Sequence, residues 1–179
     1  KSALHTSAMY EAYRYLQNNG EKVYIVNDTY PEKLNENKNL ELLIVPCADY
    51  MPEKVWQEIE EFIENGKTVI FAEYNTSYYN ENGKSLDSAL KNNVLNNATK
   101  VSFDGWNQNT VTFTGCANVY SEIENVISAF VKDIEVESGN GETEWTVAEY
   151  NGGYVVNLCN YGESETTITI NYKGEACGE

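Results

Sequence analysis

The sequence is short of the residues from which most catalytic and metal sites are built. It has one histidine, His5, and its four cysteines, Cys47, Cys116, Cys159 and Cys177, form no CxxC pair. A structural zinc site needs such ligands at close spacing, so none is predicted. Four separated cysteines allow three disulfide pairings, and the sequence does not choose among them. Because a chain of this length can bury a core without cross-links, we expect free, buried thiols.

Positive charge and long apolar runs are also scarce. Lys and Arg number 12 against 28 Asp and Glu, which gives a net charge of −16. Such a chain repels nucleic acids and anionic membrane surfaces, whose binding depends on cations. No apolar run approaches the roughly 18 residues of a membrane span. We therefore expect a soluble protein with no nucleic-acid or membrane partner, and its compartment stays open between bacterial cytoplasm and secretion.

The familiar nucleotide motifs are missing as well. There is no GxGxxG, and Gly66-Lys67-Thr68 matches only the end of a P-loop. That tripeptide lies between a predicted helix and a predicted strand, whereas a phosphate-binding loop must open a helix. The acidic residues of the same helix are expected to face solvent and not to converge on a metal. The sequence therefore predicts neither a cofactor nor a metal.

The first three quarters of the chain alternate between helical and strand patterns. Apolar residues at helical spacing predict a helix over Ser2–Asn19 and a second one between Asp49 and Gly66, with Pro52 in its first turn. Short apolar runs predict strands at Lys22–Asn27, Leu40–Pro46, Thr68–Glu73, Val101–Phe103 and Thr110–Gly115. Further helical segments are expected at Pro31–Asn37, Ser85–Lys91 and Tyr120–Val131. This order predicts an α/β fold with a largely parallel sheet.

Beyond residue 132 the apolar period changes from 3.6 to 2. Four strands are predicted, at Asp133–Glu137, Glu144–Tyr150, Tyr154–Asn160 and Thr166–Tyr172. Asn151-Gly152 between two of them is a strong two-residue hairpin signal. We therefore predict an α/β domain over residues 1–132 and a small antiparallel β domain over residues 133–179.

Two kinds of catalytic group deserve consideration. Cys47 follows a predicted buried strand, where a nucleophile elbow would lie, and His5 is the only histidine that could act as its base. The local sequence lacks the glycines of a strained elbow. Paired carboxylates for glycoside hydrolysis could come from Glu73, Asp104, Glu144 and Glu149. The chain is too short for a TIM barrel of about 250 residues that would carry such a pair. No catalytic residue is predicted.

Aromatic residues are the remaining candidates for a binding site. The chain has 14 Tyr and three Trp. Four of them, Tyr74, Tyr78, Tyr79 and Trp106, lie in or near the long loop that follows a central strand. Aromatic rings can stack on sugars, but tyrosine is equally suited to packing and to interfaces. We favour packing or an interface for these residues and keep a sugar site as the alternative.

Four stretches together resemble a known arrangement. They are Tyr10–Asn27, Leu40–Pro46, Val55–Thr68 and Glu144–Asn160. In their order and apolar pattern they are similar to the β-galactosidase trimerisation domain of glycoside hydrolase family 42 and related glycosidases, followed by the small C-terminal β domain. The resemblance implies a flavodoxin-like fold, of the class I glutamine-amidotransferase type, that has lost its catalytic residues.

That resemblance also implies a function. In the family, this domain assembles the oligomer and walls the active site, while the catalytic carboxylates lie in an upstream barrel. We therefore expect a non-catalytic accessory segment of a β-galactosidase-like glycoside hydrolase. Its expected partners are the upstream catalytic domain of the same chain, further copies of the chain, and neutral carbohydrate. Since the sequence starts at Lys1 without a signal-like region, we expect it to be a piece of a longer protein. The alternatives are a carbohydrate-binding module and, less favoured, a cysteine-dependent amidotransferase-like enzyme.

Overall fold

The computed structural model describes residues 2–74, 77–86, 88–103, 106–107, 112–113, 117–130, 132–139 and 142–178. The chain forms two compact units. The first contains Lys1–Ala12 and Ile25–Ile127, and the second contains Tyr13–Tyr24 and Ser128–Glu179. The expected division into domains at residues 1–132 and 133–179 stays a prediction.

A parallel sheet forms the centre of the first unit. Its strands are β1 (Leu42–Pro46), β2 (Thr68–Glu73) and β3 (Thr99–Ser102), in the order β1-β2-β3. Leu42 pairs with Thr68, and Ile70 of β2 pairs with Thr99. The connections run through α3 (Glu53–Glu64) and α4 (Ala89–Asn97), as parallel pairing requires.

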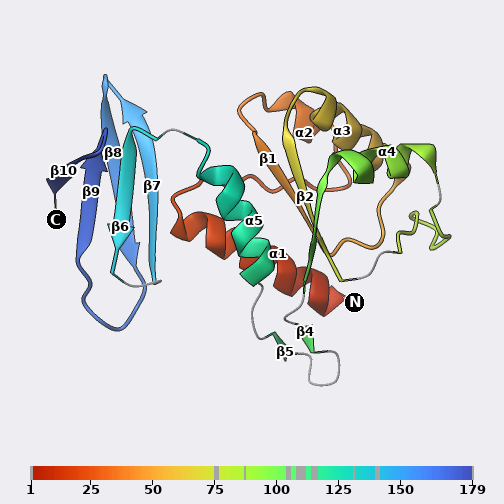
Figure 1. Ribbon diagram of the computed structural model, residues 1–179, viewed down its shortest axis with the longest axis horizontal. Helices are drawn as coiled ribbons and strands as arrows, with labels where there is room; N and C mark the ends of the chain where they lie inside the picture. Colours follow the sequence, from red (N-terminus) through yellow and green to blue (C-terminus); the bar gives the residue numbers. More distant parts are fainter. Residues whose placement is uncertain are drawn as a thin grey trace. The chain divides into compact units, whose positions relative to one another are not determined.

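Helices cover both faces of this sheet. Figure 1 shows α2 (Lys33–Glu36), α3 and α4 on one side, and α1 (Ser2–Asn18) and α5 (Ala117–Ile127) on the other. Alternate residues of a strand point to opposite faces, so β2 contributes to both layers. Val69 and Phe71 belong to the cluster that includes Trp56 of α3, whereas Ile70 and Ala72 are buried outside it. The continuous apolar run of residues 69–72 within β2 is explained by burial on both faces.

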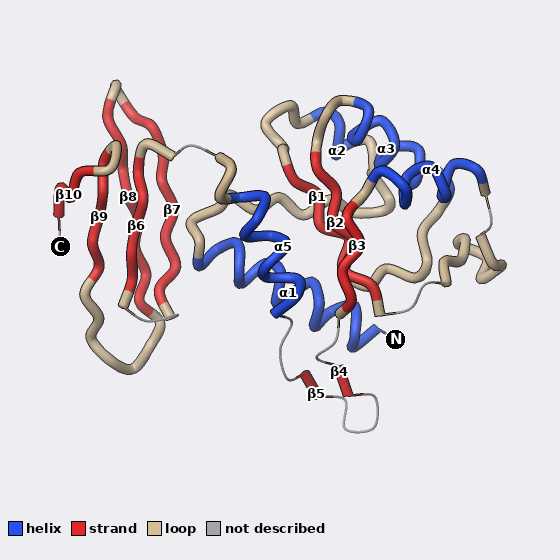
Figure 2. The backbone as a smooth tube through the Cα atoms, viewed as in Figure 1, coloured by secondary structure: helices blue, strands red, loops and turns tan. Residues whose placement is uncertain are grey.

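The second unit contains small antiparallel sheets, shown as red segments in Figure 2. One has the order β10-β9-β6, from β10 (Glu175–Gly178), β9 (Ile168–Tyr172) and β6 (Ile134–Ser138). The other is the hairpin of β7 (Thr143–Tyr150) and β8 (Gly153–Asn160). The turn residues Asn151 and Gly152 both have positive φ, 50° and 77°, as a type I′ turn requires. The sequence-predicted hairpin is confirmed.

Two short strands complete the described elements. They are β4 (Trp106–Asn107) and β5 (Thr112–Phe113), which pair with each other. They fall in or beside the predicted segment Thr110–Gly115, most of which lies outside the described residues. The predicted α/β class, with a parallel sheet and a small C-terminal antiparallel β unit, is confirmed.

Three element predictions need correction. Lys22–Asn27 is not a strand: Tyr24 and Ile25 are 54% and 68% exposed, and no described strand pairs with this segment. An alternating pattern cannot form a strand without a neighbour to bond with. The helix expected at Ser85–Lys91 begins instead at Ala89, because the hydroxyl of Ser88 accepts a hydrogen bond from the Lys91 N–H and caps it. The helix expected at Tyr120–Val131 covers Ala117–Ile127.

Candidate functional site

The carboxyl edge of the parallel sheet is the natural place for a site in this fold, because ligands of α/β proteins bind beyond the carboxyl ends of the strands. Cys47 follows β1, Glu73 ends β2, and Phe103 follows β3. Several residues singled out by sequence therefore come to this edge, and their environments decide what the edge can do.

A loop covers the ends of β1 and β2. The N–H of Tyr79 donates to the Asp49 carbonyl at 2.8 Å, and the N–H of Met51 donates to the Tyr79 carbonyl at 3.0 Å. The loop is then closed on itself, since the Leu86 N–H donates to the Tyr78 carbonyl at 2.8 Å. These bonds attach the loop to the segment between β1 and α3 in the manner of an added strand.

Tyr78 is the part of this loop that fills the edge. Its side chain is 5% exposed and meets Trp56 edge-on, with ring centroids 5.2 Å apart and planes at 87°. It makes a similar contact with Phe71 at 6.1 Å. Its hydroxyl donates a hydrogen bond to the Glu73 carboxylate. Burial first, and this hydrogen bond second, raise the pKa of Tyr78 far above its usual range. Tyr78 is thus a core residue with no ring face open to a sugar.

Tyr79 points to a different partner. It stacks on Tyr50, with centroids 5.1 Å apart and planes at 22°. Tyr50 is 50% exposed, and Tyr74 and Tyr79 are half-buried. The side chain of Trp106 lies outside the described residues. Tyr78 and Tyr79 thus have different partners, and the structure pairs Tyr79 with Tyr50, which the sequence analysis missed. Tyr50 lies just after a buried strand and before a helix, and this position in the sequence could have indicated that it belongs to the site.

Cys47 adopts a left-handed backbone conformation, with φ of 47°, which is uncommon for a residue other than glycine. Its N–H donates to the Ala72 carbonyl at 2.7 Å, and its side chain is 7% exposed. The ring of His5 lies beside it, with Nδ1 2.5 Å from the carbonyl oxygen of the adjacent Pro46. The geometry resembles an elbow more than the sequence indicated. The burial of the thiol is nevertheless unfavourable for a nucleophile, which must meet its substrate.

Cys159 differs from Cys47 in its surroundings. Both are free thiols, as expected, but Cys159 is exposed and only Cys47 is buried. The side chains of Cys116 and Cys177 lie outside the described residues. The expectation of buried thiols is therefore correct for Cys47 and wrong for Cys159, because the face of β8 that carries Val155, Asn157 and Cys159 is uncovered.

The candidate carboxylates that the structure describes have different surroundings. Glu73 is bonded to Tyr78, and Asp104 lies outside the described residues. Glu144 and Glu149 both lie on β7, five positions apart, so they point to opposite faces of the strand. Among the described residues no group of three or more His, Cys, Asp or Glu could hold a metal ion.

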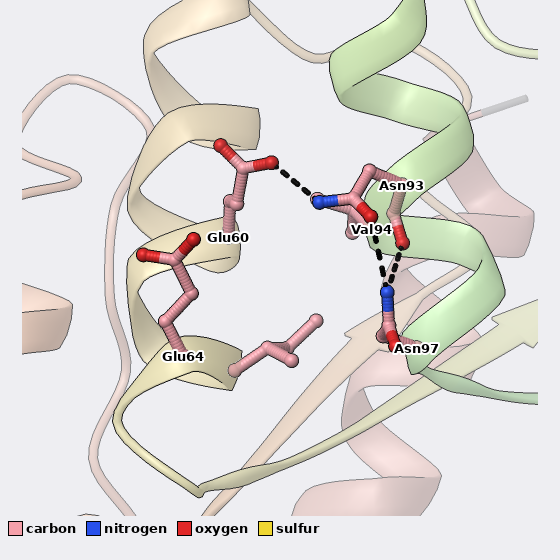
Figure 3. A pocket seen from close by; sticks show the side chains of 6 residues that line it. Glu60, Glu64, Asn93, Val94 and Asn97 are labelled. Atoms are coloured by element: carbon pink, nitrogen blue, oxygen red, sulfur yellow. Dashed lines mark hydrogen bonds between the residues drawn. The ribbon is translucent and has the colours of Figure 1, made fainter.

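A groove of about 240 Å³ lies elsewhere, between α3 and α4. Figure 3 shows the carboxylate of Glu60 accepting a hydrogen bond from Asn93 at 2.7 Å, and Asn97 donating to Asn93. Glu64, Ile63 and Val94 complete the lining. Glu60, Asn93 and Asn97 hydrogen-bond to one another at its rim, so these three groups are occupied.

The comparisons with known proteins define the fold. No family model matches the chain, and no curated protein sequence matches it. The fold is related to part of a glycoside hydrolase of family 42. The structure that carries this relation is the crystal structure of an apo exo-carrageenase of family GH42 from Bacteroides ovatus, with a TM-score of 0.64 and 17% sequence identity. The match covers 94% of this chain and 22% of that protein. No helix in the described part of the chain is long and apolar enough to cross a membrane.

Proposed function

We propose that this chain is a non-catalytic accessory segment of a glycoside hydrolase, with a role in assembly or in walling the active site. One observation carries the proposal: a single family 42 glycosidase chain matches 94% of these residues, across both compact units. The chain spans only 22% of that enzyme, which leaves room there for a separate catalytic domain.

The filled carboxyl edge supports the same interpretation. An enzyme of this fold class needs an open cavity at that edge, whereas Tyr78 occupies it with a buried ring bonded to Glu73. The thiol of Cys47, directly after β1, is also buried. A non-catalytic domain can have this edge closed without losing its function, because it needs no substrate cavity there.

The coding sequence that flanks the segment tests this proposal. We expect a barrel-sized α/β domain with a carboxylate pair on its strand ends, and we expect the purified 179-residue chain to hydrolyse no galactoside or carrageenan oligosaccharide. Deletion of the segment from the full-length protein should leave those carboxylates in place and disturb assembly or catalysis. Turnover by the isolated chain, or flanking sequence without a glycosidase domain, would overturn the proposal.

A second candidate function is carbohydrate binding, which the stacked pair Tyr50 and Tyr79 favours. A half-exposed tyrosine held by a second ring offers a fixed face to a sugar. The charge of −16 restricts the ligand to neutral glycans, since it repels sulfated and uronic acid sugars.

Affinity electrophoresis in gels containing neutral polysaccharides tests this candidate. Tyr50→Ala and Tyr79→Ala should both abolish retardation, whereas Tyr10→Ala, at a tyrosine 57% exposed on α1, should not. Tyr78→Ala is unsuitable, because it would empty part of the core. Unretarded wild-type protein in every gel would eliminate the candidate and leave the accessory role untouched.

A further inference from the structure

Asparagine followed directly by glycine occurs five times in the sequence. The pairs are Asn19-Gly20, Asn65-Gly66, Asn82-Gly83, Asn140-Gly141 and Asn151-Gly152. In any such pair the backbone nitrogen of the glycine is able to attack the side-chain amide before it, because glycine has no Cβ to hinder the approach. The product is a five-membered succinimide ring. The structure describes every pair except Asn140-Gly141, and it separates them by how readily that ring can close.

Ring closure demands one particular backbone angle. It brings the glycine nitrogen into line with Cβ of the asparagine about the Cα–C bond. In an L-residue this alignment occurs at a ψ of about −120°, which is also the ψ of the first central residue in a type II′ turn. Reaching it rotates the whole peptide unit between the two residues, so a hydrogen bond donated by that unit must break.

Three of the described pairs have such a bond. The glycine N–H of each donates to a backbone carbonyl three residues earlier: Gly20 to Gln17 at 3.0 Å, Gly66 to Ile63 at 2.9 Å, and Gly83 to Asn80 at 2.9 Å. Asn65 has a ψ of 7°, far from the angle that the ring needs. The side chain of Asn19 is also held, since its amide donates to the Tyr15 carbonyl at 2.8 Å. The local structure therefore protects these three pairs.

Asn151-Gly152 lacks this protection. Both residues are exposed and lie between β7 and β8, outside either strand. Within the described part of the chain, neither the Asn151 carbonyl nor the Gly152 N–H has a hydrogen-bond partner. A Cβ built on Gly152 would meet nothing within 4 Å, so the space around this peptide unit is open. The unit can rotate without breaking a bond.

The turn also brings Asn151 close to the required geometry. Its φ is 50°, and no other asparagine of the described residues has a positive φ. Types I′ and II′ share a positive φ at the first central residue and differ by a flip of the peptide unit that follows. The flip takes the ψ of Asn151 to about −120° and reverses the sign of the Gly152 φ, which glycine accepts readily. Because both turns close a two-residue hairpin, Tyr150 and Gly153 remain paired while the ring forms.

We propose that Asn151 is a site of spontaneous deamidation, in which the backbone nitrogen of Gly152 is the nucleophile and water is the co-reactant. The Gly152 nitrogen gives its proton to hydroxide and bonds to Cγ of Asn151. The bond from Cγ to Nδ2 breaks, and the amide takes a proton from water and leaves as ammonia. Water then opens the ring on one side of its nitrogen. Scission of the bond to Cγ yields aspartate, and scission of the bond to the main-chain carbonyl carbon yields isoaspartate.

Both products change the tip of the hairpin. Each replaces a neutral amide with a carboxylate, which adds one negative charge to a chain of net charge −16. Isoaspartate also routes the main chain through Cβ, and it thereby lengthens a turn whose geometry depends on having two residues. Among the described Asn-Gly pairs, the β7–β8 turn is thus the first to be modified with time.

Peptide mapping by mass spectrometry tests the site. The folded protein and the same protein in urea are incubated at mildly alkaline pH, where the peptide nitrogen loses its proton more readily. In the folded protein, Asn151 should deamidate about tenfold or more faster than Asn19, Asn65 and Asn82, whose following glycines must first lose a hydrogen bond. In urea the four rates should converge, because the same residue follows each asparagine. Equal rates in the folded protein would overturn the proposal, as would an Asn151 that deamidates only in urea.

The identity of the product tests the mechanism. The ring yields both aspartate and isoaspartate, whereas direct hydrolysis of the side-chain amide by water yields aspartate alone. Electron-transfer fragmentation of the modified peptide distinguishes the two products. Isoaspartate at this position is the expected result, and aspartate alone would overturn the role of the Gly152 nitrogen.

Asn151→Gly is the control for the assignment, because glycine suits a positive φ in this turn and has no amide to lose. The variant should fold as wild type does by circular dichroism, and the mass gain at the turn should vanish. Persistence of that gain would place the modification at another residue and overturn the assignment. The proposal rests on the β7–β8 turn and not on the glycosidase assignment, so its failure would leave the latter standing.

Discussion

The indole of Trp145 lies directly against Gly20, so closely that a Cβ on this glycine would fall 2.2 Å from the ring atom Cζ3. Lys132 Nζ lies over the same ring, 5.8 Å from its centre. Lys132 also pairs with Glu21 at 2.5 Å and donates to the Asn19 carbonyl at 3.2 Å. The end of α1 and the β7 strand are thereby joined within the second unit.

Gly20→Ala should therefore destabilise the protein by about 3 kcal/mol or more, since it adds overpacking to the strain of a left-handed residue. Gly66→Ala is the matched control: its φ of 78° is similar, but nothing lies within 4 Å of the added Cβ. It should cost about 1 kcal/mol. Urea denaturation measures both values, and equal losses would contradict the packing argument.

Replacement of Tyr78 by Phe should lower stability by about 2 kcal/mol, because Glu73 loses a hydrogen bond donor. Burial and that bond raise the pKa of Tyr78 in the folded protein above its unfolded value of about 10. The folded state thus favours the neutral phenol. This contribution is fully present below pH 10 and is lost as the pH rises above it.

Denaturation series across that alkaline range check the sign. Wild type should lose stability more steeply than Tyr78→Phe. Tyr154, whose hydrogen bond to Asp133 and partial desolvation raise its pKa to about 12, titrates in both proteins and cancels from the difference. Parallel curves would show that Tyr78 does not couple to folding through its proton.

The two described thiols should react at different rates. Iodoacetamide should modify Cys159 readily in the native protein, whereas Cys47 should react only when the protein unfolds. Peptide mapping by mass spectrometry separates them from Cys116 and Cys177. Rapid modification of Cys47 under native conditions would support the alternative function, a cysteine-dependent amidotransferase-like enzyme.

The cap of α4 should be measurable as well. Ser88→Ala removes the acceptor for the Lys91 N–H and should cost about 1 kcal/mol, while Ser88→Asp should retain most of the stability. Thermal melts of the three proteins check this. A full loss in Ser88→Asp would mean that the serine acts through packing and not as a cap.

The sequence predicted the helix α3 and the strand β2 well, because their patterns are local. Pro52 marks the start of α3, and the run from Thr68 to Glu73 is apolar enough to require burial on both faces. The segment around Ile25 has an equally strand-like pattern, yet it forms no strand. Strand formation also needs a neighbour, which no local pattern reports.

The candidate site was less predictable for the same reason. The sequence placed Tyr78 and Tyr79 together in one loop, although adjacent residues of an extended segment point in opposite directions. Tyr78 turned into the core against Trp56, and Tyr79 turned out to Tyr50. A tyrosine-rich loop indicates that aromatics matter, but not which of them face solvent.

The loop that covers the carboxyl edge has a consequence for exchange with solvent. The amides of Met51, Tyr79 and Leu86 are bonded to backbone carbonyls over a buried ring, so their hydrogens should exchange as slowly as those of a central strand. By its rate of hydrogen exchange, this loop should belong to the most protected part of the first unit. A ligand directed to the edge would have to wait for the loop to open, and opening would expose the core beneath it.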